Sequence, residues 1–93
     1  MISKKEWDSY TTKKQDKLSE DVWSYRQCQK CLNYIYLGGN NEENAEGMYL
    51  DGHPFDCSDE AIDKYEIKNN FSFCDNTFCW KCINQIKNDL DGA

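Results

Sequence analysis

Two cysteine pairs constrain the fold of this chain more than any other feature of its sequence. Cys28 and Cys31 form one C-x-x-C pair, and Cys79 and Cys82 form the other. At this spacing two thiolates can reach one metal ion at about 2.3 Å each, and two such pairs complete the tetrahedral shell of four sulfurs that is typical of structural zinc. The sequence therefore predicts one structural Zn²⁺ that is held by these four residues.

The chain needs such a crosslink because it is poor in aliphatic side chains. Leu, Ile, Val and Phe together supply 16 of the 93 residues, and so low a content in a strongly charged chain borders on the composition of disordered proteins. Thirteen aromatic residues and six cysteines favour folding, because small domains are stabilised by metal or disulfide links. We expect a single zinc-binding domain over residues 1–93, with its aromatic side chains packed around the metal.

The cellular compartment decides whether cysteines bind metal or form disulfides. The chain has no run of about 18 apolar residues, and its first residues are polar rather than the apolar segment of a secretory signal. These features predict a cytoplasmic protein with no membrane segment. In a reducing cytosol, cysteines act as metal ligands far more often than as disulfides.

The first 27 residues are predicted to form a helical extension. Ser3-Lys4-Lys5-Glu6 has the form of a capping box, which indicates the start of a helix. A polar stretch over 11–17 interrupts the apolar pattern that follows, which predicts one long helix or two short ones. The residues at helical spacing are Trp7, Tyr10, Leu18, Val22 and Tyr25.

Residues 28–90 are predicted to form the zinc-finger core. Residues 33–37 and 48–50 are rich in strand-forming types and flank a dense turn signal, which predicts a β-hairpin with an acidic tip over 40–47. Residues 71–73 alternate like a short strand, and residues 74–77 are typical of a turn. The core therefore carries an acidic insertion, which we place over 40–70.

Two helices are expected in this core. Ser58-Asp59-Glu60 resembles a helix start, so we predict a short inserted helix over 58–66. A C-terminal helix over 79–90 is expected to begin with the second cysteine pair, because a helix N-terminus favours thiolate charge. The residues expected to face inward are Ala61, Ile62 and Tyr65 in the first helix and Cys79, Cys82, Ile83, Ile86 and Leu90 in the second.

The predicted order of elements resembles that of the treble-clef zinc fingers. A knuckle carries the first cysteine pair, a hairpin follows, and a helix carries the second pair. The resemblance rests on Cys28, Cys31, Cys79 and Cys82, and it implies a small α+β fold held together by zinc. Separately, the stretch Phe78-Cys79-Trp80-Lys81-Cys82 looks like the F-C-W-x-C core of in-between-RING ubiquitin-ligase domains. Those domains need a further His and Cys downstream, which are missing here, so ligase activity is not implied.

His53, Cys57 and Cys74 leave three interpretations open. The favoured one makes the two cysteines small buried side chains and the histidine a loop residue. In the second interpretation the three residues bind a second Zn²⁺, with an aspartate as a fourth ligand. In the third, Cys74 or Cys57 replaces a ligand of the first site.

The charge pattern favours a protein partner over nucleic acid. The net charge is −6, and residues 32–78 contain ten acidic and two basic residues. A nucleic-acid-binding surface is normally rich in Lys and Arg, whereas acidic side chains among aromatic ones suit a partner with a basic surface. The candidate partner contacts are Glu42, Glu43, Glu46, Asp51, Asp59, Glu60, Asp63 and Tyr49.

Nothing in the sequence forms a catalytic constellation. The chain has one histidine and no arrangement of nucleophile and base that would support a reaction, so we expect no enzymatic activity and no catalytic residues. A closed four-sulfur site also leaves no position for a reactive water.

These observations favour a noncatalytic, acidic protein that is crosslinked by zinc. We expect it to bind a host nucleic-acid-handling protein and to inhibit or modulate it. Residue types typical of AT-rich genomes (Phe, Tyr, Met, Ile, Asn and Lys) number 37 against 10 Gly, Ala, Arg and Pro, which suggests a phage or mobile element as the source. One alternative is a zinc-finger transcription regulator that binds nucleic acid through its basic N-terminal helix. A remote alternative is an HNH-type nuclease that uses His53, although such an enzyme needs a second histidine for its catalytic ion. The basic residues of the first alternative are Lys4, Lys5, Lys13, Lys14 and Lys17.

Overall fold

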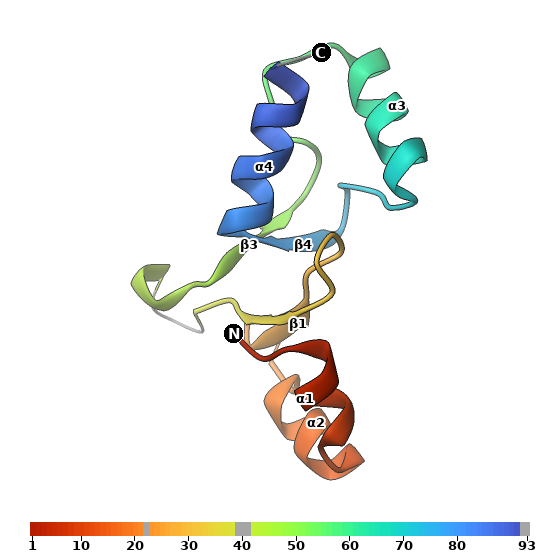
Figure 1. Ribbon diagram of the computed structural model, residues 1–93. Helices are drawn as coiled ribbons and strands as arrows, with labels where there is room; N and C mark the ends of the chain where they lie inside the picture. The colour runs from red at the N-terminus through yellow and green to blue at the C-terminus, as the bar shows by residue number, and fades with distance from the viewer. Residues whose placement is uncertain (22, 39–41, 92–93) are drawn as a thin grey trace.

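Four α-helices and two antiparallel strand pairs make up the part of the chain that the computed structural model describes, residues 1–21, 23–38 and 42–91. Helices α1 and α2 lie at one end, α3 and α4 lie at the other, and the strands lie between them (Figure 1). In these residues no helix is both long and apolar enough to cross a membrane. The elements in chain order are α1 (Lys4–Ser9), α2 (Thr12–Leu18), β1 (Tyr25–Gln27), β2 (Tyr34–Tyr36), the 3-10 helix η1 (Glu42–Asn44), β3 (Gly47–Leu50), α3 (Asp59–Asn69), β4 (Asn76–Cys79) and α4 (Trp80–Asp91).

The N-terminal extension contains two short helices, which was one of the two predicted arrangements. Ser3 caps α1 by accepting a hydrogen bond from the Glu6 amide at 3.1 Å, as the capping box predicts. Thr11 caps α2 by accepting from the Lys14 amide at 3.2 Å. The break between the helices therefore coincides with a second capping residue.

The predicted helical role of Tyr25 is wrong, because this residue begins strand β1. It pairs with Tyr36 of β2, and the two rings lie 5.4 Å apart. A cross-strand aromatic pair of this kind stabilises a sheet and here outweighs the local helical spacing.

Trp7 of α1 stacks on Tyr34 of the same hairpin with ring centroids 4.0 Å apart, which packs the extension against β1 and β2. Val22, the other residue expected in this helix, lies outside the described residues.

The predicted hairpin between residues 33–37 and 48–50 is also wrong. Strand β2 pairs with β1, whereas β3 pairs with β4, so the two segments belong to different sheets. The turn at the first cysteine pair is short and returns the chain directly onto β1, which is the most local partner. Strand β3 instead lies against β4 with Gly47 opposite Cys79 and Leu50 opposite Asn76.

Gly47 allows this close pairing of β3 and β4. A Cβ atom at this position would lie 2.3 Å from the carbonyl oxygen of Phe78, 2.3 Å from Cδ1 of Ile35 and 2.8 Å from Cα of Cys79. The absence of a side chain is therefore required where the backbones approach each other.

Residues 71–73 do not form the predicted strand, and the strand begins instead within the predicted turn, at Asn76. The backbone amides of this segment bind the end of α3: the Phe71 amide donates to the Glu66 carbonyl at 3.2 Å, and the Phe73 amide donates to the Glu66 carboxylate at 2.8 Å. These bonds hold the segment against the end of α3. Because the amides of Phe71 and Phe73 are already used, they cannot donate to a neighbouring strand. The Phe73 side chain is nevertheless only 1% exposed.

The two remaining helices were predicted from local patterns. Helix α3 is capped by Ser58 as expected, but it continues to Asn69 and ends on Asn70 in the left-handed conformation. Helix α4 buries Cys82, Ile86 and Leu90 on one face. Cys79 was expected on this helix but is the last residue of β4.

One hydrophobic core joins β2, β3, β4, α3 and α4, and it includes three of the cysteines. Phe71, Phe73 and Phe78 pack edge-on or tilted against one another, with ring centroids 5.3 to 5.6 Å apart. The buried members of this core are Cys28, Ile35, Leu37, Leu50, Ile62, Phe73, Phe78, Cys79, Cys82, Ile86 and Leu90.

Candidate metal centre

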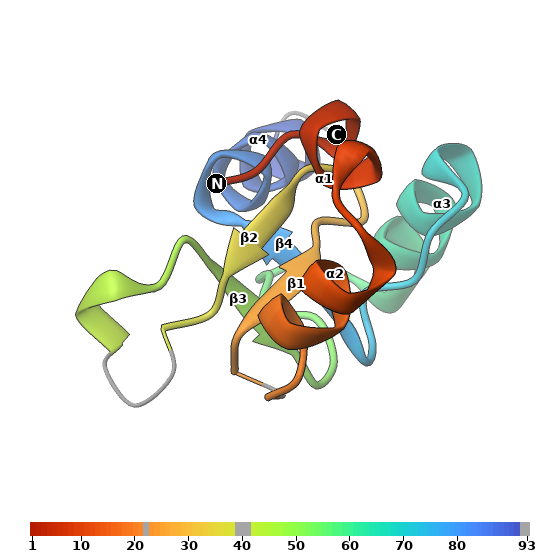
Figure 2. The same ribbon diagram turned by 90° about the horizontal axis from the view of Figure 1, so that it is seen from below.

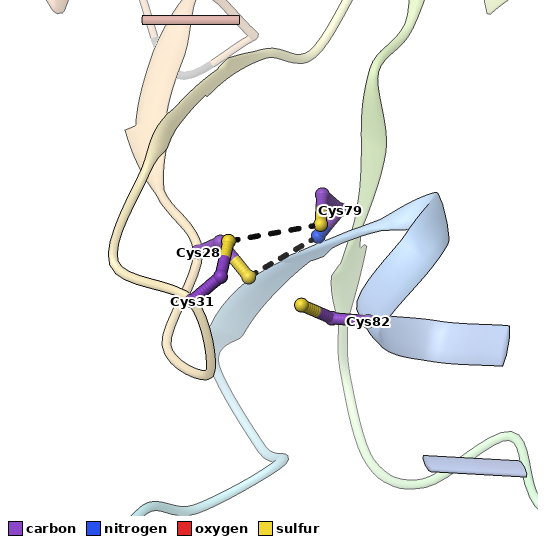
Figure 3. Close-up of side chains that lie close together, drawn as sticks. All are labelled: Cys28, Cys31, Cys79 and Cys82. Carbon is purple, nitrogen blue, oxygen red and sulfur yellow. Dashed lines mark hydrogen bonds between the residues drawn. The ribbon is translucent and has the colours of Figure 1, made fainter. Parts of the chain in front are cut away.

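Four cysteines from three parts of the fold meet at one point in the core. Cys28 and Cys31 lie in the turn between β1 and β2, Cys79 ends β4, and Cys82 lies in the first turn of α4. Their Sγ atoms all lie within 4.8 Å of one another. Figure 3 shows the Cys82 sulfur directed towards the other three. The four residues predicted from their spacing are therefore positioned to bind a metal ion.

The turn that carries the first pair is fixed by backbone hydrogen bonds. The Cys28 amide donates to the Asn33 carbonyl at 2.8 Å, and the Leu32 amide donates to the Cys28 carbonyl at 2.9 Å. Leu32 adopts the left-handed conformation, with φ of 67°, which directs the chain back into β2. The sequence pattern did not single out Leu32, because this conformation is usual for Gly and uncommon for Leu.

Hydrogen bonds join strand β4 to this turn and place Cys79 beside Cys28. The Gln29 amide donates to the Thr77 carbonyl at 3.1 Å, and the Thr77 hydroxyl donates to the Gln27 carbonyl at 2.8 Å. The Cys79 amide then donates to the Cys28 sulfur at 3.4 Å (Figure 3). An amide that points at a sulfur in this way stabilises its thiolate form. Thr77 and Gln29 thus position Cys28 and Cys79 without belonging to the cysteine cluster.

Burial and crowding make this cluster unfavourable for four thiolates without a cation to neutralise them. Cys28, Cys79 and Cys82 are 0%, 2% and 5% exposed, whereas Cys31 lies at the surface. Burial and the neighbouring sulfurs raise the pKa of Cys82. Burial also opposes ionisation of Cys28, but the backbone amides of Cys31, Cys79 and Lys30 outweigh it and lower the pKa of Cys28. A divalent cation would neutralise the crowded thiolates, which is the chemistry that this donor set fits.

The other candidate ligands do not join this cluster. His53 lies in the loop after β3 with Nε2 3.5 Å from an Asp59 oxygen, and Cys57 is half-buried against the core. Neither residue belongs to a group within metal-binding distance in the described part of the chain. Cys74 is exposed and has Asp51 and Asp75 as its close neighbours. His53 and Cys74 do line one cavity of about 330 Å³.

The acidic residues expected to contact a partner do not form one face. Asp59, Glu60 and Asp63 lie on α3, whereas Glu42 and Glu43 lie on η1. Figures 1 and 2 show α3 and η1 on opposite sides of the molecule. The sequence placed all of them in one insertion, but the packing of α3 beside α4 separates them.

Three further candidates lie near β3 and differ in their surroundings. Tyr49 is exposed on β3 and donates its hydroxyl to an Asp75 oxygen at 2.6 Å, and Asp51 follows the strand. The Glu46 carboxylate accepts from the Tyr36 amide at 2.9 Å and pairs with the amino group of Met1. Glu46 therefore links two parts of the fold rather than facing outward.

Comparison with known proteins gives no relative: no protein-family description, curated protein or solved structure matches this chain.

Proposed function

We propose that Cys28, Cys31, Cys79 and Cys82 hold one Zn²⁺ as a structural crosslink, in a protein that acts by binding another protein. The observation that carries the proposal is the cluster of four sulfurs within 4.8 Å, drawn from three separate elements. Four thiolates fill a tetrahedral shell and select a soft ion such as zinc. The metal would then stabilise the fold without catalysing a reaction.

The arrangement of elements supports a treble-clef-like description of this site. A cysteine-bearing turn lies between β1 and β2, a second strand pair follows, and α4 carries Cys82 in its first turn. Helix α3 is inserted between β3 and β4, which accounts for the long separation of the two cysteine pairs. In this proposal the zinc links the N-terminal hairpin to the α3–α4 half of the molecule.

The charge of the molecule supports a basic protein as the partner. The formal net charge is −6, and four thiolates with one Zn²⁺ add two negative charges, which gives about −8. Such a surface attracts proteins that carry basic grooves, and nucleic-acid-handling proteins are the common examples. We propose that the protein inhibits or modulates a partner of this class, in a phage or mobile-element setting.

Direct binding measurements separate this proposal from the nucleic-acid alternative. We expect the zinc-loaded protein to show no salt-sensitive binding to labelled duplex DNA or single-stranded RNA, and to release DNA from a basic partner captured from an AT-rich bacterial host. Salt-sensitive binding of nucleic acid by the protein itself, abolished by Lys13→Glu with Lys17→Glu on α2, would overturn the proposal and favour a regulator. Substituting Lys64 and Lys68 of α3 in the same way is the matched control.

A further inference from the structure

One groove gathers four of the seven large apolar residues that are exposed in the described part of the chain. Trp23, Met48, Tyr49 and Trp80 are 49%, 42%, 39% and 45% exposed, and all four line a groove of about 380 Å³ beside β3. Seven large hydrophobic side chains are exposed in the described residues, so four in one groove indicates clustering rather than scatter. Clustered exposed apolar side chains mark interaction sites, and Trp, Tyr and Met are enriched in them. We call these four residues the indole groove.

A hydrogen bond orients the indole of Trp80, and another fixes the backbone at Trp23. The Trp80 indole donates from Nε1 to the Ala45 carbonyl at 2.9 Å, and the Trp23 amide donates to an Asp21 oxygen at 3.0 Å. Rigid aromatic side chains lose little conformational entropy on binding, so they make effective anchors. Neither ring is needed to fill the core, because both remain about half exposed.

The backbone beside the groove is open to an extended segment. Strand β3 supplies Met48 and Tyr49 to the groove and pairs with β4 along one edge. Within the described residues no strand pairs with its other edge. A free strand edge next to side-chain pockets is the arrangement that binds peptides by adding a strand.

The acidity of the chain, and of the segment that supplies Met48 and Tyr49 to the groove, favours a cationic occupant. Residues 32–58 include η1, β3 and the loop after it, and they contain no Lys or Arg. The same stretch contains five carboxylates, at positions 42, 43, 46, 51 and 56, of which Glu46 is already paired with the Met1 amino group. The basic residue next in sequence to the groove is Lys81, which follows Trp80. Nucleic acid and a second copy of this acidic chain would both be repelled, whereas Arg and Lys are attracted by carboxylates and by the faces of indole rings.

We propose that the indole groove binds an extended segment of the partner protein that carries Arg or Lys side chains between apolar residues. This proposal rests on the proposed function and names the surface through which it acts. The cations lie over the faces of Trp23 and Trp80, and the apolar side chains pack on Met48. The segment adds to the free edge of β3.

The test uses the zinc-loaded full chain, its metal content verified, and a short capped peptide of alternating arginine and leucine. Nuclear magnetic resonance follows the three indole N–H signals. We expect the signals of Trp23 and Trp80 to shift on titration and that of the buried Trp7 to stay. Trp23→Ala and Trp80→Ala should each weaken binding by about 10-fold or more. Ile67→Ala, which removes an 81% exposed side chain on α3, should leave the affinity unchanged.

Four outcomes would overturn the proposal. Equal affinity of both tryptophan variants and the parent protein would show that the peptide binds by diffuse charge attraction. Equal binding of a glutamate–leucine peptide would refute the argument from charge. Indole shifts on concentrating the protein alone would make a second copy the occupant. If the protein is folded and contains its full zinc but does not bind the peptide, the proposal for the indole groove is refuted and the proposed zinc site is unaffected. If the parent protein contains no zinc or does not fold, the proposed zinc site is refuted instead.

Discussion

Gly47→Ala is the substitution whose cost follows most directly from the packing around the cysteine cluster. The added Cβ would lie 2.3 Å from the Phe78 carbonyl oxygen and 2.8 Å from Cα of Cys79, which are both backbone atoms. Nonbonded carbon atoms prefer about 3.5–4.0 Å, so β3 and β4 would have to separate by about 1 Å. Ile35, whose Cδ1 is also 2.3 Å away, is fully buried and has little space to move.

We expect Gly47→Ala to lower the free energy of unfolding by about 3 kcal/mol or more, the upper end of the range for overpacked cores. The same separation would displace Cys79, so the affinity for zinc should also fall. Urea unfolding at a fixed free zinc concentration measures the first effect, and competition with a chromogenic chelator measures the second.

Gly52→Ala is the matched control for this substitution. Gly52 has φ of 124°, but a Cβ there would meet no atom within 4 Å. Only backbone strain is added, at a cost of about 1–2 kcal/mol, and zinc affinity should not change. If Gly47→Ala costs no more than Gly52→Ala and leaves zinc affinity unchanged, the described pairing of β3 with β4 is incorrect.

Three further predictions concern the turn, the surface and a comparison of a clustered cysteine with a cysteine outside the cluster. Leu32→Gly should raise the free energy of unfolding by about 0.5–1 kcal/mol in urea unfolding, because Leu32 has φ of 67°; destabilisation would refute the left-handed turn. The hydrogen bond to Asp75 raises the pKa of Tyr49 to about 12, so this bond is present at lower pH and is lost as the pH rises through that value. Asp75→Asn should return the pKa of Tyr49 towards 10 in an ultraviolet titration read against Tyr49→Phe, and an unchanged titration would contradict the bond. Cys79→Ser should strip the metal or unfold the chain, whereas Cys57→Ser should leave the zinc content unchanged; loss of zinc from Cys57→Ser would indicate a second metal site.

Features that depend on residues close in sequence could be predicted from the sequence. The cysteine ligands follow from the C-x-x-C spacing, and the starts of α1 and α3 follow from the capping side chains of Ser3 and Ser58. The buried face of α4 follows from its helical periodicity. The helix starts, the buried helix face and each cysteine pair are set within one or two turns of the chain, where spacing and capping act directly. The meeting of the two distant pairs follows from the four ligands that one zinc ion needs.

Features that depend on distant partners could not be predicted in this way. The pairing of β3 with β4 joins segments separated by the whole of α3, and short apolar runs carry no information about their partners. Residues 71–73 have a strand-like pattern, but the Glu66 carboxylate binds the Phe73 amide and holds the segment as a helix cap. The indole groove was missed because Trp23 and Trp80, 57 residues apart in sequence, line one groove only after folding.

The metal content of the purified protein tests the central claim most directly. Protein purified without chelator should contain one zinc per chain, and X-ray absorption at the zinc edge should show four sulfur neighbours at about 2.3 Å. Removal of the metal with a chelator should then abolish the cooperative thermal unfolding seen by circular dichroism. A zinc content well below one per chain, or an unfolding transition unchanged by the chelator, would contradict the claim that Cys28, Cys31, Cys79 and Cys82 form a structural zinc site.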